Sequence, residues 1–240
     1  MKNIMIISGA GLSAESGLKT FRDADGLWEN YNVMEVCSVE GWKNNRKKVT
    51  DFYNERRAQL KNVQPNTAHY NFAKLEEMYE GEVWHLTQNV DNLLEQAGCK
   101  NVIHLHGTLT DLRCESCDEV FEVMYKKQTD DMICPNCEGS HIRHNVVMFG
   151  EAAPKYQYIS QAIEHCEQFI AIGTSGSVID IVDLASHFDD SLLINPVSEV
   201  YMNALGSQNR SIDSYFSHFI QKTAVDSIKL MNDWIKSYYE

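Results

Sequence analysis

Four cysteines have the spacing of a metal site. Cys114 and Cys117 form one C-x-x-C pair, and Cys134 and Cys137 form a second pair 16 residues further on. Four thiolates at this spacing can close a tetrahedral zinc site with no open coordination position, so the pattern predicts one structural zinc. The odd total of seven cysteines favours metal binding in a reducing compartment over disulfides. We expect the remaining three to be buried thiols: Cys37, Cys99 and Cys166.

A glycine-rich turn near the N-terminus has the spacing of a nucleotide-binding loop. Gly9, Gly11 and Ala14 satisfy G-x-G-x-x-G/A directly after the apolar run 4–7. In that pattern the first glycine makes a tight turn, the second lets the backbone approach pyrophosphate, and the amides of the next helix face phosphate. A tight strand-to-helix connection without a ligand is the alternative. Residues 20–28 read as a loop, so the second strand with the ribose-binding acid of a dehydrogenase is missing.

Polar side chains follow the next two expected strands. Gln88, Asn89 and Asp91 come directly after an apolar run, at the strand end where open α/β sheets bind ligands. Asp91 could instead cap the short helix 93–98. Residues 102–107 read as one strand, and His106 beside Gly107 could serve as a general base near neutral pH. A single histidine is more often structural, so the pattern alone does not decide.

One helical stretch carries an anion-binding pair. Residues 28–61 have helical apolar spacing, and within them Tyr53 and Arg56 are three residues apart and so share one face. A guanidinium and a phenol could together bind a carboxylate. The alternative is a solvated face on which Arg56 or its neighbour pairs with Glu55 or Asp51.

The expected elements alternate between strand and helix, which predicts an α/β fold. The apolar runs 4–7, 83–86, 102–107, 169–172 and 192–194 read as strands, separated by helical stretches that begin near residues 67, 93 and 156. A closing helix is expected over 223–239. Residues 143–149 read as a strand that ends at Gly150 and returns the chain to the main sheet, so that the zinc module is an insertion.

Composition and charge narrow the class of protein. The 240 residues are 43% hydrophobic and 23% charged, as in ordinary globular proteins. The net charge is 21 − 34 = −13, so we expect no direct nucleic-acid binding. The N-terminal apolar run is too short for a signal peptide, and no run approaches the roughly 20 residues of a membrane helix. The sequence therefore predicts a cytoplasmic protein without membrane association.

The ordered set of motifs resembles the sirtuins, a family of NAD-dependent protein lysine deacylases. The match runs from about residue 4 to 195 and includes the glycine loop with Ser13-x-x-Ser16-Gly17, Phe21-Arg22, Gln88-Asn89-Val90-Asp91, His106-Gly107, the four cysteines, Phe149-Gly150-Glu151 and Gly173-Thr174-Ser175. The resemblance implies a Rossmann-type parallel sheet with helices on both faces, plus a smaller lobe made of a zinc ribbon and a helical module. The expected divisions are an NAD-binding domain over 1–30, 65–110 and 145–240, a helical module over 31–64 and a zinc-ribbon module over 111–144.

The resemblance also assigns roles to residues. His106 would be the catalytic base, and NAD would be consumed as a co-substrate, giving nicotinamide and O-acyl-ADP-ribose. The cofactor-binding residues would be Gly9, Ala10, Gly11, Glu15, Phe21, Arg22, Gln88, Asn89, Asp91, Gly173, Thr174, Ser175 and Asn195. The substrate-binding residues would be Tyr53, Arg56, Val147, Phe149 and Gly150, of which the last three would pair with an extended peptide as an added strand. The expected partners are proteins that contain acylated lysines.

The acyl preference follows from the same resemblance. The bacterial and mitochondrial branch that removes succinyl and malonyl groups has a similar Tyr-x-x-Arg, in which the arginine would pair with the distal carboxylate of the acyl group. That branch has a small residue at a position aligned here with Cys37. The chain departs from the family pattern at His144-Asn145 and at Ile179-Asp180, where prolines are common. The alternative functions are a mono-ADP-ribosyltransferase and a non-catalytic NAD-binding regulatory protein.

Overall fold

A six-stranded parallel sheet forms the centre of the molecule. The computed structural model describes residues 2–19, 27–28, 31–201 and 210–237. The strand order is β13-β10-β9-β1-β4-β5, and every neighbouring pair is parallel. The strands are β1 (Ile4–Ser8), β4 (Val83–Thr87), β5 (Val102–His104), β9 (Gln168–Ile172), β10 (Asp190–Ile194) and β13 (His218–Ile220). The predicted Rossmann-type sheet is confirmed.

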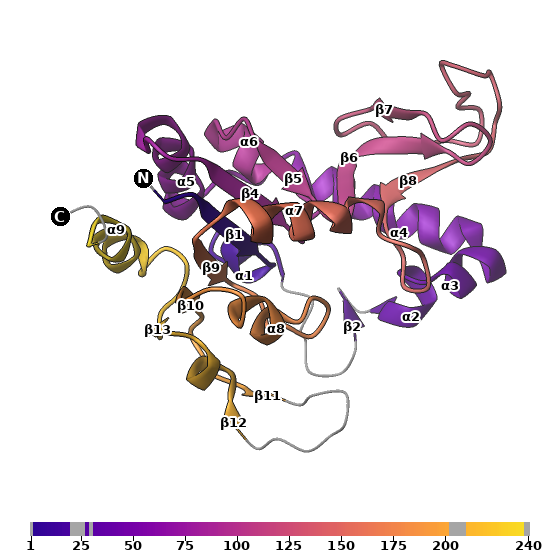
Figure 1. Ribbon diagram of the computed structural model, residues 1–240. Helices are drawn as coiled ribbons and strands as arrows, with labels where there is room; N and C mark the ends of the chain where they lie inside the picture. The colour runs from indigo at the N-terminus through magenta and orange to yellow at the C-terminus, as the bar shows by residue number, and fades with distance from the viewer. Residues whose placement is uncertain (1, 20–26, 29–30, 202–209, 238–240) are drawn as a thin grey trace.

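Helices cover both faces of this sheet (Figure 1). In β1, Met5 and Ile7 face one core and Ile4 and Ile6 face the other, as the two-residue period of a strand requires. The first core is closed by α7 (Gln157–His165) and α8 (Ile181–Ala185), and the second by α5 (Thr67–Met78), α6 (Leu93–Ala97) and α9 (Ile228–Lys236). Burial on both faces explains why the central strands read as unbroken apolar runs.

The helix ends follow their capping residues. Asn66 accepts hydrogen bonds from the amides of Ala68 and His69, and the His69 side chain accepts one from the Asn66 amide, so a reciprocal cap begins α5. Gly98, with φ +109°, ends α6. The closing helix begins at Ile228, later than the predicted residue 223. Thr223 instead forms a local turn in which its hydroxyl accepts a hydrogen bond from the Asp226 amide.

A smaller lobe combines helices with a second sheet (Figure 1, upper right). The helices are α2 (Val33–Val36), α3 (Val39–Asn44) and α4 (Arg46–Leu60), and the antiparallel sheet has the order β7 (Val120–Glu122), β6 (Gly107–Cys114) and β8 (Ile142–Val146). Phe52 of α4 shares a buried cluster with Leu109 and Val146 of that sheet. The helical module and the zinc-ribbon module therefore pack as one unit.

Two strand predictions are wrong at this junction. The run 143–149 does not return to the main sheet, because β8 pairs antiparallel with β6, with Cys114 opposite Ile142. The predicted strand 102–107 ends at His104, and Gly107 begins β6. The second sheet thus spans 107–146 and is wider than the predicted module 111–144. Residues 105 and 106 form a turn that carries the chain from one sheet to the other, and apolar alternation cannot reveal such a change.

Short elements complete the described chain. They are α1 (Gly11–Ala14), the strand pair β2 (Leu27–Trp28) and β3 (Tyr31–Asn32), the strand pair β11 (Val200–Tyr201) and β12 (Arg210–Ser211), and the 3-10 helices η1 (Pro154–Tyr156) and η2 (Ile212–Tyr215). The predicted loop 20–28 lies largely outside the described residues. Among the residues described, no helix has the length and apolar character needed to cross a membrane.

Candidate active site and metal centre

A cavity of about 610 Å³ lies where the carboxyl ends of β1, β4 and β9 meet the small lobe. Most of the predicted site residues line it, although they come from distant parts of the sequence. They are Gly9, Ala10, Gly11, Gln88, Asn89, Asp91, His106, Gly173, Thr174, Ser175 and Asn195, together with Tyr53, Arg56, Val147, Phe149 and Gly150. The structure therefore gathers the predicted nucleotide-binding and substrate-binding residues around one cavity.

Three predicted residues are not brought to this cavity by the described structure. The Glu15 carboxylate accepts hydrogen bonds from the Thr223 hydroxyl at 3.0 Å and the Val225 amide at 2.9 Å. Glu15 thus anchors the segment before α9 and does not line the cavity. Phe21 and Arg22 lie outside the described residues.

The two glycine turns of the site pack directly on each other. The Gly11 amide donates to the Gly173 carbonyl at 2.9 Å, and Gly173 has φ +63°. A Cβ atom on Gly9 would lie 2.7 Å from the Gly173 carbonyl oxygen, and one on Gly11 would lie 2.6 Å from the Gly173 Cα. These glycines are therefore required by the contact between the two loops. The pattern predicted a turn but could not reveal the partner loop.

The first glycine loop differs from the predicted phosphate-binding helix start. Helix α1 has only four residues. Its amides at Gly11, Leu12 and Ser13 donate to the carbonyls of Gly173, Gly9 and Ala10. Because backbone carbonyls already satisfy them, these amides do not form the row of free donors that the glycine pattern predicted.

Side-chain hydrogen bonds join the ends of β4, β9 and β10. Gln88 Nε2 donates to Thr174 Oγ1 at 3.0 Å, and Asn195 Nδ2 donates to the Thr174 carbonyl at 2.7 Å. The Gln88 amide donates to the Ser8 carbonyl at 2.9 Å. These contacts fix a row of polar groups along the edge of the sheet, where parallel α/β sheets bind nucleotides.

A buried hydrogen-bond network supports the floor of the cavity. The Ser13 hydroxyl donates to Asp91 Oδ2 at 2.9 Å and accepts from Asn89 Nδ2 at 3.3 Å. His69 Nδ1 accepts the Asn66 amide, so Nε2 carries the ring proton and donates to Ser13 Oγ at 3.3 Å. Burial lowers the pKa of His69 to about 4 and raises the pKa of Asp91.

The roles of Ser13 and His69 in this network were missed by the sequence reasoning. The motif that contains Ser13 assigns it no partner, and none of the motifs includes His69. The available signal was the position of the histidine, three residues after an asparagine N-cap, where a side chain can reach back to the capping amide.

The two adjacent histidines have different surroundings. His104 is buried and bonded through Nδ1 to the Asn89 carbonyl at 2.9 Å and through Nε2 to Glu95 at 2.7 Å, which is a structural arrangement. His106 lines the cavity, with Nδ1 at 3.1 Å from the Gln88 carbonyl and Nε2 at 2.8 Å from the Tyr156 hydroxyl. Burial lowers the pKa of His106, which favours the neutral ring that a general base requires.

At the small-lobe end of the cavity, Arg56 has an incompletely paired guanidinium. Its side chain is 8% exposed, and Nε and Nη1 are buried without a hydrogen-bond partner among the described residues. Nη2 reaches Glu55 only at 3.5 Å. The Tyr53 hydroxyl hydrogen-bonds with the Cys37 thiol, and both side chains line the same wall as Arg56. The predicted Tyr-x-x-Arg pair therefore faces the cavity.

The neighbouring arginine has a different role. Arg57 is 1% exposed, and its Nε donates to the Leu109 carbonyl at 2.5 Å while Nη1 donates to Asn54 Oδ1 at 2.9 Å. Asn54 Oδ1 also accepts the Gln128 amide at 2.8 Å. Arg57 thus ties α4 to the zinc-ribbon sheet through neutral acceptors. The alternative left open by the sequence is met in part by Arg56, which forms an ion pair with Glu55 at 3.5 Å, while Asp51 pairs with Lys47.

The segment after β8 is held from two sides. The Val147 amide donates to the His106 carbonyl at 2.9 Å. The Phe149 amide donates to the Cys37 carbonyl at 2.8 Å, and its carbonyl accepts the Val39 amide at 3.0 Å. Glu151 closes the turn by accepting the Met148 amide at 2.9 Å and pairing with Arg143. Both backbone groups of Phe149 are therefore already used inside the protein.

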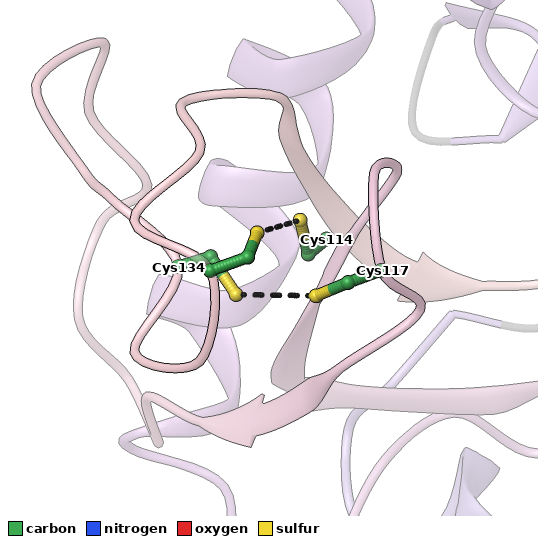
Figure 2. A group of neighbouring side chains, drawn as sticks. Cys114, Cys117 and Cys134 are labelled. Atoms are coloured by element: carbon green, nitrogen blue, oxygen red, sulfur yellow. Dashed lines mark hydrogen bonds between the residues drawn. The ribbon is translucent and has the colours of Figure 1, made fainter.

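The four predicted zinc ligands form a separate cluster in the ribbon. Their Sγ atoms all lie within 4.8 Å of one another, and the Cys114–Cys137 and Cys117–Cys134 sulfur pairs are each 3.6 Å apart. Figure 2 shows Cys114, Cys117 and Cys134 pointing toward one another. A tetrahedral zinc with bonds of about 2.3 Å places its sulfur ligands roughly 3.8 Å apart, so the donor set fits.

Comparison with known proteins decides the family. The model of the Sir2 family matches residues 9–180, most of the chain. This chain belongs to the Sir2 family. It is 55% identical over 193 residues to an NAD-dependent protein deacylase of Campylobacter jejuni, which covers 80% of this chain and 82% of that protein. An NAD-dependent protein deacylase of Helicobacter pylori is 43% identical over 210 residues, covering 87% of this chain and 90% of the relative.

Solved Sir2 structures have the same architecture. A Sir2 homologue in complex with NAD has a TM-score of 0.80 and 32% identity, covering 98% of this chain and 90% of that one. A Sir2 homologue in complex with ADP-ribose has a TM-score of 0.81 and 32% identity, covering 99% of this chain and 94% of that one. The fold and the family predicted from the Sir2-type motifs are confirmed.

Proposed function

We propose that this protein is an NAD-dependent lysine deacylase that removes succinyl and malonyl groups in addition to acetyl groups. The observation that carries the acyl preference is the Arg56 guanidinium, which is buried at the cavity wall with Nε and Nη1 unpaired. The Glu55 carboxylate lies 3.5 Å from Nη2, so the guanidinium is only weakly paired. A weakly paired buried charge is costly, and a second carboxylate placed beside it recovers much of that cost. An acyl group that ends in a carboxylate supplies this partner, whereas an acetyl group does not.

Tyr53 and Cys37 support the same end of the pocket. The Tyr53 phenol lies one helical turn from Arg56 and can donate a second hydrogen bond to the distal carboxylate. Its present partner is the Cys37 thiol, which is a weak hydrogen-bonding group and is readily exchanged for a carboxylate oxygen. Cysteine is also small, which leaves room for the longer acyl chain.

The catalytic roles are assigned to residues at the sheet end of the cavity. The acyl-lysine oxygen attacks the nicotinamide ribose, nicotinamide leaves, and neutral His106 then accepts a proton from a ribose hydroxyl so that the sugar oxygen attacks the imidate carbon. Water completes the reaction and gives lysine and O-acyl-ADP-ribose. Asn89 and Asp91 would surround the nicotinamide, Gln88 the ribose, and Thr174 and Asn195 the adenosine half, positions supported by their shared cavity and mutual hydrogen bonds.

The acyl-lysine protein is proposed to bind as an extended strand beside residues 147–150. Because both backbone groups of Phe149 are already bonded to Cys37 and Val39, we assign the pairing to Gly150 and to the Val147 carbonyl. The Phe149 ring, 39% exposed at the cavity, would contact the substrate side chain. We further propose a cytoplasmic location and protein rather than nucleic-acid partners, in line with the net charge of −13.

The test is deacylation of matched acetyl-lysine and succinyl-lysine peptides, with and without NAD, followed by mass spectrometry. In Arg56→Met, kcat/KM for the succinyl peptide should fall roughly 100-fold, because the variant loses a charge-assisted hydrogen bond that contributes about 3 kcal/mol. The kcat/KM for the acetyl peptide should change less than about threefold. Arg46→Met, on the same helix but paired with Glu115, is the control and should leave the ratio unchanged. His106→Ala should abolish NAD-dependent loss of both acyl groups.

The same experiment separates the other functions. Equal losses for both peptides in Arg56→Met would contradict the proposed carboxylate pocket. Transfer of ADP-ribose to the peptide without acyl loss would identify a mono-ADP-ribosyltransferase. NAD binding without turnover would identify a regulatory protein.

A further inference from the structure

The nitrogen of His106 that has to act as the base is occupied by a tyrosine. The Gln88 carbonyl, 3.1 Å from Nδ1, can only accept a hydrogen bond, so in the neutral ring Nδ1 carries the proton and Nε2 carries the lone pair. The Tyr156 oxygen lies 2.8 Å from Nε2, so the phenol is the donor in this contact. The lone pair that would accept a substrate proton is therefore already hydrogen-bonded.

Tyr156 is held in this position by its surroundings. It ends η1, which follows the turn closed by Glu151, and its ring packs against the buried cluster that includes Leu105 and Ala162. The ring centroids of Tyr156 and His106 lie 5.8 Å apart at an angle of 45°, so only the hydroxyl reaches the imidazole. Tyr156 also lines the cavity and is therefore in contact with the space that a bound nucleotide fills.

We propose that Tyr156 is a positioning residue for His106: its hydroxyl donates to Nε2, keeps the neutral imidazole oriented toward the cavity, and is replaced there by a ribose hydroxyl when the nucleotide binds. This inference rests on the proposed role of His106 as the base. The phenol makes the hydrogen bond that the ribose hydroxyl makes later, so the ring enters catalysis in the required tautomer and orientation. Neither sequence pattern nor motif assigns a role to Tyr156.

The charges around His106 do not offer a competing explanation for a neutral ring. In the described part of the chain its imidazole hydrogen-bonds only with the Gln88 carbonyl and Tyr156. The other titratable or charged side chains of the cavity come from the surrounding loops and helices, and they are Lys19, Cys37, Tyr53, Arg56, Asp91, Glu151 and Glu199. None of these hydrogen-bonds with His106 in the described structure, so removal of the phenol hydroxyl isolates a single contact.

The direction in which Tyr156→Phe shifts the pKa of His106 depends on which protonation state of the imidazole the phenol stabilises. Burial lowers the pKa of His106, and the hydrogen bond to the Gln88 carbonyl opposes this effect. Because a donor at Nε2 is compatible only with the neutral ring, we expect the phenol to lower the pKa of His106 further. Tyr156→Phe should raise that pKa by about 0.5 to 1 unit, the shift expected for one neutral hydrogen bond. The base would then become protonated at a higher pH, and activity would be lost earlier as the pH falls.

The experiment is an NMR titration of the histidine ring nitrogens in the free protein, with His106 assigned by comparison with His106→Gln. Tyr156→Phe should raise the pKa of His106, and Tyr158→Phe should not, because Tyr158 packs against the same cluster without bonding to His106. Tyr156→Leu provides a second variant without the hydroxyl. An unchanged pKa in folded Tyr156→Phe and Tyr156→Leu would overturn the proposal.

Addition of ADP-ribose tests the replacement step. The difference in the pKa of His106 between the wild type and Tyr156→Phe should disappear in the complex, because the ribose then occupies Nε2 in both proteins. A difference that persists at saturation would show that the phenol stays in place and would overturn this step. The acid limb of the kcat/KM profile should move upward in Tyr156→Phe by the same amount as the pKa in the free protein. The titration of the free protein uses no nucleotide and no acyl peptide. It therefore tests the contact between Tyr156 and His106 independently of the peptide assay that tests the deacylase function.

Discussion

The Tyr53 ring lies flat against the imidazole of His144, with ring centroids 3.8 Å apart and ring planes at 18°. His144 is fully buried, and neither ring nitrogen has a hydrogen-bond partner among the described residues. Burial, followed by the charges of Arg143, Arg57 and Arg113, lowers the pKa of His144 well below its usual value, so the ring is neutral. The tyrosine of the proposed acyl pocket therefore stacks on a neutral imidazole. This imidazole supports the tyrosine ring by packing and not by a hydrogen bond between described residues.

From this contact we predict that His144→Phe stabilises the protein. Phenylalanine keeps a flat ring against Tyr53 and removes two buried nitrogens whose loss of solvation is uncompensated. The free energy of unfolding, measured with urea at pH 7, should rise by about 1 kcal/mol. A fall of similar size would show that the nitrogens hold buried water molecules.

Substitution by methionine should have different effects on the free energy of unfolding at Arg56 and at Arg57. Arg57→Met removes hydrogen bonds to Leu109 and Asn54 in the core and should lower the free energy of unfolding by about 3 kcal/mol. Arg56→Met removes a buried guanidinium with unpaired nitrogens, so its stability should be equal to the wild type or higher by about 1 kcal/mol. Urea denaturation of the two variants tests this difference, and equal destabilisation would contradict it.

Gly173→Ala should damage the site far more than Gly17→Ala. Both glycines have positive φ, +63° at Gly173 and +93° at Gly17, so each substitution carries a backbone cost of about 1 kcal/mol. At Gly173 the new Cβ would also lie 2.5 Å from the Leu12 amide nitrogen, whereas at Gly17 no described atom lies within 4 Å. Calorimetric titration should show NAD affinity reduced at least tenfold in Gly173→Ala only, and similar affinities in the two variants would contradict the contact between the glycine loops.

The metal site is testable without reference to activity. Protein purified under reducing conditions should contain one zinc per chain by elemental analysis, and Cys134→Ser should contain almost none. Cys166→Ser, which removes a buried thiol outside the cluster, should keep its zinc. A strong chelator should increase proteolysis of the ribbon first, because its core is a small cluster around Leu112 and Ile142. Less than about 0.2 zinc per wild-type chain would contradict the closed site.

The sequence predicted those features that depend on local pattern. Two C-x-x-C pairs and unbroken apolar strands each depend on a local pattern, and the structure confirms the cysteine cluster and the parallel sheet. The motif order also predicted the family. These features could be predicted because each depends on residues close together in the chain or on a fixed periodicity.

The missed features depend on partners far apart in the chain. The chain passes from the main sheet to the second sheet at residues 105 and 106, and the apolar alternation does not indicate this change. The sequence therefore predicts the wrong sheet for β8. Nothing near Glu15 indicates its contact with Val225, 210 residues later. The hydroxyl of Tyr156 reaches His106 across 50 residues. Such contacts require the packed structure, in which unrelated segments reach the same cavity.

The hydrogen bonds of Val147 and Phe149 limit the changes in length that the segment after β8 can accept. The same three-residue segment holds the His106 turn through Val147 and the helical module through Phe149. An insertion or deletion in it would displace both the His106 turn and the wall of the cavity that carries Cys37. Under the proposed function, acyl selectivity would change more readily by exchange of a side chain on α4, such as Arg56, which lines the cavity without taking part in these backbone hydrogen bonds.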